Sequence, residues 1–99
     1  MLDVVITVVK MTFHADLSKK YENVIDHACS MTEGMTFVSK HGVMPEGFCE
    51  EAWKSVGPFV VRLSEGETDF FDGWMKDEKT AVISCNDGIR PVSFLLKAL

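Results

Sequence analysis

The sequence predicts a small two-layer α+β domain, in which about four mostly antiparallel strands carry two helices on one face. Three observations support this prediction. The chain opens on an apolar stretch with strand periodicity, closes on two apolar runs separated by turn residues, and has two segments of helical periodicity between them. The expected order is therefore β-α-β-α-β-β, with the helices segregated to one side of the sheet.

The opening strand has one wholly apolar face and one mixed face. The apolar face is formed by alternate residues, Leu2, Val4, Ile6 and Val8. This pattern is typical of a central strand in a sheet that is covered on one side.

A first helix is predicted to begin after Asp16, a good N-cap residue, and to end near residues 27–30. Its apolar positions at helical spacing are Leu17, Tyr21, Val24, Ile25 and Ala28. A short strand at residues 35–39 is expected to follow this helix.

The second helix is predicted from a long apolar stripe at three- and four-residue steps. The stripe consists of Cys49, Ala52, Trp53, Val56, Phe59, Val60 and Leu63. Gly57-Pro58 interrupts it, because the proline ring disfavours a helical residue before it and removes a hydrogen-bond donor. We expect a kink at this point, or two short helices that meet at an angle.

The stretch from Thr80 to Leu96 predicts a closing β-hairpin. Its two apolar runs flank the turn residues at 86–88, Asn-Asp-Gly. In the second run, Val92, Phe94 and Leu96 alternate with less apolar positions, so one face of this strand is expected to be buried. Pro91 cannot donate to a ladder, which places it at the start of the second strand or on an edge.

Length and composition indicate one globular domain spanning residues 1–99, with 46% hydrophobic and 25% charged residues. The net charge is −5 and the basic residues are scattered, so nucleic acid and anionic membrane surfaces are not expected as partners. No apolar run approaches the roughly 18 residues needed to cross a bilayer. A domain of this size folds with a modest margin, which favours a homo-oligomer that hides part of its surface.

The opening ten residues lack a basic start and a small-residue cleavage site, so they are predicted to be a strand rather than a signal peptide. The three cysteines are odd in number and far apart, which does not suggest a disulfide framework. We therefore expect a cytoplasmic protein with reduced thiols.

Two motifs stand out along the chain: MPEGFC at residues 44–49, followed by Ala52-Trp53, and CNDGIRPV at residues 85–92, followed by Phe94. Together they resemble a family of short uncharacterised prokaryotic proteins, common in anaerobic bacteria and archaea, some of which carry the unit in tandem. The resemblance covers nearly the whole chain, including Cys29 and the Phe-x-x-Trp-like patch at residues 71–74.

The chain departs from this family at two places. It has Glu50-Glu51 where family members often have Pro-Trp, and it has Ser84-Cys85 where members often have paired cysteines. The family has no established activity, so the resemblance implies a fold unit and a set of positions rather than a reaction.

The three cysteines are the first candidates for chemistry. Cys29, Cys49 and Cys85 could gather from three elements around zinc, iron or an iron–sulfur cluster, because soft sulfur suits these metals. A histidine would complete four ligands, with His14, His27 and His41 as the alternatives. However, the chain has no C-x-x-C or H-x-x-x-H spacing, and free cysteine is among the most buried residue types, so burial in the core is favoured over a metal.

A reactive thiol is the third alternative for these cysteines. Cys49 is expected in the first turn of a helix, where the helix dipole lowers the pKa of a thiol. Glu50 and Glu51 act in the opposite direction, so a small core residue is the favoured interpretation of Cys49.

Asp87 and Arg90 follow Cys85 closely at the end of the hairpin. They could clamp a carboxylate or position a proton. The simpler interpretation, which is favoured, is a turn aspartate that bonds its own backbone and an arginine that is exposed or ion-paired.

Phe70, Phe71 and Trp74 form an aromatic patch around Asp72-Gly73. Three large aromatic residues beside a glycine cannot all point inward on one strand, so this patch, with Arg90, is a candidate surface for a ligand or a partner. The alternative is a small satellite cluster under the loop.

Two classes of function remain open. The favoured class is a non-enzymatic binding module that holds a small ligand, a metal or a partner protein. The alternative is a small enzyme that uses Cys49 or Cys85 with Asp87 and Arg90, at a site that two subunits could share. The module is favoured because no catalytic constellation or phosphate-binding loop can be assembled from the spacing.

Overall fold

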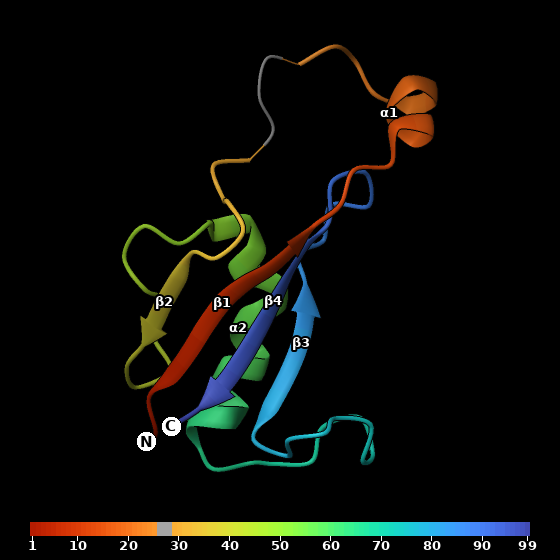
Figure 1. Ribbon diagram of the computed structural model, residues 1–99. Helices are drawn as coiled ribbons and strands as arrows, with labels where there is room; N and C mark the ends of the chain where they lie inside the picture. The colour runs from red at the N-terminus through yellow and green to blue at the C-terminus, as the bar shows by residue number, and fades with distance from the viewer. Residues whose placement is uncertain (26–28) are drawn as a thin grey trace.

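The computed structural model describes residues 1–25 and 29–99 (Figure 1). Within these residues the chain forms four strands and two helices. In order they are β1 (Val4–Met11), α1 (Ala15–Tyr21), β2 (Thr36–Ser39), α2 (Glu50–Ser64), β3 (Thr80–Ser84) and β4 (Val92–Ala98). The predicted α+β class is thereby confirmed.

The four strands form one sheet in the order β2-β1-β4-β3, and every neighbouring pair is antiparallel. The predicted central position of β1 is confirmed, and so is the closing hairpin of β3 and β4, with Pro91 directly before β4. The alternating apolar residues of β1 and β4 are buried on one face, namely Val4, Ile6, Val8, Val92, Phe94 and Leu96. A β-bulge at Val9 interrupts the register between β1 and β4.

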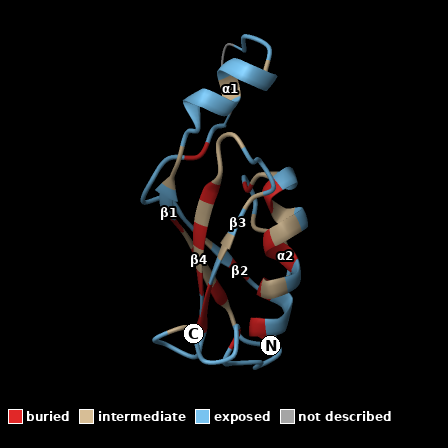
Figure 2. Cartoon of the chain, turned by 90° about the vertical axis from the view of Figure 1, so that its right-hand side faces the viewer, coloured by how far each residue is buried: buried red, intermediate tan, exposed pale blue. Residues whose placement is uncertain are grey.

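Helix α2 packs across this buried face of the sheet, where the core lies (Figure 2). Four residues of the predicted stripe are buried, Ala52, Val56, Val60 and Leu63. Trp53 and Phe59 flank them and are half-buried. The stripe therefore supplies one layer of the core, as its periodicity predicts.

Helix α2 is continuous through Gly57 and Pro58, so the expectation of two short helices is wrong, while a kink stays a prediction. Glycine at position 57 has no Cβ to clash with the proline ring, which removes part of the usual penalty for a helical residue before proline. Pro58 still cannot donate a hydrogen bond within the helix. Burial of Val56 and Val60 on either side favours the helical conformation across this missing hydrogen bond.

Helix α1 differs most from expectation. It ends at Tyr21, and its N-cap is His14, so Asp16 lies in the first turn. None of its residues is buried, and Val24 and Ile25 beyond it are exposed. Its expected apolar face is exposed, because α1 lies beyond the end of the sheet rather than on the face that α2 covers (Figure 1). The expected helical position at Ala28 falls outside the described residues.

Both termini lie at the end of the sheet opposite α1, and the backbone N–H of Leu99 donates to the carbonyl of Asp3 at 3.0 Å (Figure 1). Neither helix of the described residues has the length and apolar character needed to cross a membrane.

Candidate functional site

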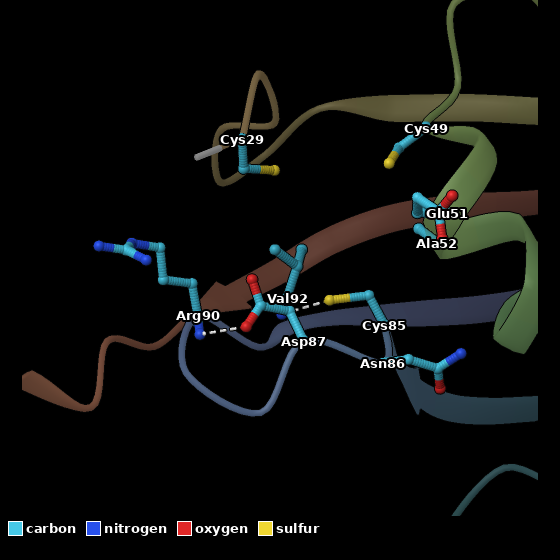
Figure 3. A pocket seen from close by; sticks show the side chains of 9 residues that line it. All are labelled: Cys29, Cys49, Glu51, Ala52, Cys85, Asn86, Asp87, Arg90 and Val92. Carbon is cyan, nitrogen blue, oxygen red and sulfur yellow. Dashed lines mark hydrogen bonds between the residues drawn. The ribbon is translucent and has the colours of Figure 1, made fainter. Parts of the chain in front are cut away.

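A pocket of about 380 Å³ lies at the end of the sheet where β3 ends and where β4 and α2 begin. All three cysteines of the chain, Cys29, Cys49 and Cys85, line it (Figure 3). They come from three segments that are far apart in the sequence, and their sulfur atoms point into the space between those segments. All three are free thiols.

Two of the thiols are positioned by regular structure. Cys49 is the N-cap residue of α2, and its carbonyl accepts the N–H of Trp53 at 2.9 Å. Cys85 follows β3 directly, and its N–H donates to the carbonyl of Val92 at 3.0 Å. The N–H of Val92 donates in return to the Cys85 sulfur at 3.3 Å, so this thiol has a fixed hydrogen-bond donor.

Cys29 has a different setting. It is exposed and belongs to the segment that leads into β2. The N–H of Met31 donates to its sulfur at 3.4 Å, and Met31 itself is buried in the core. The buried Met31 therefore holds the backbone two residues after Cys29, while the side chain of Cys29 faces the pocket.

The expectation that the cysteines are buried core residues is wrong for Cys29 and only partly met by the other two. Cys49 and Cys85 are half-buried, and each packs against the core on one side while lining the pocket. The reason is that each lies at the very end of an element, where the core stops and the pocket begins.

No three Cys, His, Asp or Glu side chains of the described residues lie close enough to hold one metal ion as they stand. Among the histidines considered as a fourth ligand, His14 and His41 are exposed and do not line the pocket, and His27 lies outside the described residues.

Asp87 lines the same pocket from the loop between β3 and β4. Its Oδ1 accepts the backbone N–H groups of Ile89 at 2.8 Å and Arg90 at 3.0 Å, which confirms the predicted turn aspartate. These two hydrogen bonds hold the pKa of Asp87 below its usual value, so the carboxylate is ionised at neutral pH.

Arg90 contributes to the pocket wall, but its guanidinium group is engaged elsewhere. It forms an ion pair with Glu22 and lies 4.7 Å from the ring centroid of Phe13. The hydrogen bond from Arg90, together with one from Ser18, lowers the pKa of Glu22. The arginine therefore faces away from the cysteines (Figure 3), and the predicted ion-paired arginine is confirmed.

The aromatic patch divides into a buried and an exposed part. Phe70 is buried and packs on Phe59. Phe71 is 43% exposed and Trp74 is 85% exposed. These residues precede β3 whereas Arg90 follows it, so the patch and Arg90 lie at opposite ends of the sheet and do not form one surface (Figure 1).

Several residues of the site are absent from the sequence prediction. Glu22 and Phe13, which hold Arg90, have no local signal because the contact between Glu22 and Arg90 spans 68 positions. Glu51, which the sequence identifies only as a charge near a helix start, lies at the pocket wall with Ala52. One feature of the sequence could have predicted that Glu51 lies near Cys49: both residues are at the N-terminal end of α2.

Comparison with models of protein families, with curated proteins and with solved structures found no match. The two motifs of the prokaryotic resemblance nevertheless meet at the pocket, because Cys49 ends the first motif and Cys85 begins the second.

Proposed function

We propose that the chain is a small binding module that holds a soft metal ion through cysteine thiolates in this pocket. The observation that carries the proposal is that the only three cysteines of the chain line one cavity. Thiolate sulfur is the ligand that zinc, cuprous copper and iron–sulfur centres prefer.

The hydrogen bonds to sulfur support this proposal. Cys29 and Cys85 each accept a backbone N–H, from Met31 and Val92. Such contacts orient and tune the sulfur ligands of metal centres.

The charge of the pocket wall also favours a cation. Glu51 and Asp87 are acidic, and Arg90, the one basic residue among the described lining residues, is paired with Glu22. Thiolates would add further negative charge that no side chain of this wall neutralises. A bound metal ion would supply the missing positive charge.

Metal binding requires the sulfur atoms to approach one another. With Zn–S bonds of about 2.3 Å, sulfurs that share one ion lie roughly 4 Å apart. Cys49 and Cys85 adjoin α2 and β3, whereas Cys29 is exposed and lies outside the helices and strands, so we expect Cys29 to move inward on metal binding. Zinc sites built from cysteine and histidine contribute on the order of 10 kcal/mol of binding free energy, against about 1–2 kcal/mol for each backbone residue that is ordered.

The test is native mass spectrometry and metal analysis of protein purified without oxygen, followed by titration with zinc. We expect one ion per chain, with the affinity reduced at least about tenfold in each of Cys29→Ser, Cys49→Ser and Cys85→Ser, because each variant removes a ligand. Ser30→Ala is the matched control, since Ser30 is exposed next to Cys29 and does not line the pocket. A metal-free mass in excess zinc and in excess cuprous copper would contradict the proposal.

A small cysteine enzyme is the second candidate, favoured because Cys49 and Cys85 share the pocket with Asp87 and Arg90. The engagement of Arg90 with Glu22 weighs against it, since the guanidinium group is not free to act on a thiol or a substrate. Rapid alkylation of Cys49 or Cys85 by iodoacetamide in the native, metal-free protein, at a rate above that of an ordinary thiol, would favour the enzyme.

The proposal also includes the location of the protein in the cell and its assembly. A cytoplasmic location is supported by the three free thiols, which a reducing compartment preserves. A homo-oligomer is supported by exposed apolar side chains on the face of the sheet opposite α2, among them Val38 and Val82.

A further inference from the structure

We propose that the loop between α2 and β3, residues 65–79, is a docking surface for a basic, arginine-containing segment of a partner protein. Phe71 and Trp74 receive a guanidinium group, and the acidic side chains around them hold the neighbouring positive charges. The loop precedes β3 whereas the cysteine pocket lies where β3 ends, so the docking surface is separate from the proposed metal site (Figure 1).

Two aromatic side chains are displayed on the outside of this loop. Trp74 is 85% exposed and Phe71 is 43% exposed, and together with Asp72 they line a groove of about 330 Å³. Phe71, Asp72 and Gly73 all have left-handed backbone conformations, with φ of 60°, 57° and 83°. A bulky residue rarely adopts this conformation. Here it accompanies a turn that the N–H of Trp74 closes on the carbonyl of Phe71 at 3.2 Å, and Phe71 is exposed directly after the buried Phe70.

The aromatic cluster behind this groove already binds one guanidinium group from within the chain. The guanidinium carbon of Arg62 lies 4.7 Å from the ring centroid of Phe70, and the group pairs with Glu67. Phe59 connects this arrangement to the groove, because its ring centroid lies 6.0 Å from those of both Phe70 and Phe71. The groove offers the same two kinds of group, aromatic faces and a carboxylate, on the exposed side of the cluster.

The charge of the loop favours a positively charged occupant. Residues 65–79 contain six acidic and two basic residues, a net charge of −4, which is most of the net charge of −5 of the chain. Among the described residues, Asp69 and Asp72 form no salt bridge, and no cation stacks on Phe71 or Trp74. Carboxylates and aromatic faces are therefore available to a cation that the described part of the chain does not supply.

The distribution of this charge distinguishes a basic segment from other occupants. A free organic cation would contact only the groove, and it would leave unused the exposed carboxylates farther along the loop, such as Glu65 and Glu78. A second copy of the chain, docked by two-fold symmetry through the same surface, would place one acidic loop against another. A segment with several basic residues matches both the groove and the carboxylates, and tryptophan and arginine are the residues that most often dominate the binding energy of an interface.

The test measures the binding of a fluorescently labelled peptide of alternating arginine and glycine to the full chain by fluorescence anisotropy. A second peptide carries citrulline, a neutral isostere, in place of every arginine. We expect the arginine peptide alone to bind, with its affinity reduced at least about tenfold in Trp74→Ala and about two- to fivefold in Asp72→Asn. Tyr21→Ala and Asp16→Asn are the matched controls and should bind as the wild type does, because both residues are exposed in α1, beyond the other end of the sheet (Figure 1).

Four results would overturn the docking surface. They are an absence of binding to the wild type, equal binding of the arginine and citrulline peptides, wild-type affinity in Trp74→Ala, and equal losses in the control variants. Free argininamide that competes at the same concentration as the peptide would overturn the basic segment as the occupant, because the groove would then be a site for a free cation. Circular dichroism and the unfolding midpoint of Trp74→Ala establish that a loss of binding is not a loss of folding.

Discussion

Neighbouring side chains in the loop between β3 and β4 have different partners and therefore different roles. Asp87 bonds the backbone of its own loop, which shapes one wall of the pocket. Arg90 reaches Glu22, which follows α1, and so ties the end of α1 to the hairpin loop. The acid and the base thus bind different partners, although they lie three positions apart.

The ion pair between Arg90 and Glu22 makes a pH-dependent contribution to stability. The pKa of Glu22 is lowered in the folded protein, chiefly by the Arg90 hydrogen bond. A carboxylate whose pKa falls on folding stabilises the native state above its unfolded pKa, and this contribution is lost as the pH falls through the folded pKa. We expect Glu22→Gln to lower the free energy of unfolding slightly at pH 7 and to have progressively less effect below about pH 4.

Urea unfolding of the wild type and Glu22→Gln at a series of pH values measures this difference. Glu46→Gln is a suitable control, because Glu46 is exposed and has no salt bridge among the described residues. A gap between wild type and Glu22→Gln that stays constant from pH 7 to pH 3 would show that the ion pair is not its cause.

Sequence reasoning succeeds at this scale where the interaction is local. The turn role of Asp87 is predictable because its partners lie two and three residues away. The partner of Arg90 is not predictable, because 68 positions separate it from Glu22. The meeting of the three cysteines has the same character: it was one alternative among three in the sequence, and only the packing of distant segments brings them to one pocket.

The periodicity of helix α2 and of the two central strands correctly predicts which of their faces are buried. Their apolar residues repeat at the spacing of a buried face, and the buried residues observed are those of the repeat. Helix α1 is predicted too long because its apolar residues also repeat at helical spacing, but those that the structure describes are exposed. Periodicity predicts which face would be buried, not whether a partner is present.

Gly57 leaves room for the side chain of Trp53, which lies one turn earlier in the same helix, α2. A Cβ at this position would lie 2.7 Å from Cε2 and 2.8 Å from Nε1 of Trp53, and it would also approach the ring of Pro58. In an exposed helix, replacing glycine by alanine stabilises by about 1 kcal/mol. Here we expect Gly57→Ala to destabilise by about 1–3 kcal/mol instead, because the indole must leave its edge-to-face contact with Phe48.

A double-mutant cycle with Trp53→Ala identifies the cause. In the Trp53→Ala background the indole is absent, so the cost of Gly57→Ala should shrink toward the residual clash with Pro58. Strictly additive effects in the cycle would exclude the clash with Trp53 and leave the proline as the explanation.

At the scale of the whole molecule, the sheet and α2 enclose the core, and the pocket lies at one end of this packed unit. Cys49 and Cys85 are carried by the ends of α2 and β3, whereas Cys29 enters from the segment between α1 and β2. Binding residues are commonly placed on loops at the edge of a rigid scaffold. The part of the chain that would adjust on metal binding therefore lies outside the helices and strands.

This division predicts that the two helices contribute very differently to stability, and a matched pair of leucines measures it. Leu63 of α2 is fully buried in the core, whereas Leu17 of α1 is 37% exposed and lies in a helix without buried residues. We expect Leu63→Ala to lower the free energy of unfolding by about 2–5 kcal/mol, because it removes buried methyl groups and leaves a cavity. Leu17→Ala should change it by no more than about 0.5 kcal/mol. Urea unfolding of metal-free protein compares the two variants directly, and a cost at Leu17 similar to that at Leu63 would mean that α1 packs against the domain, or against a second copy of it, in solution.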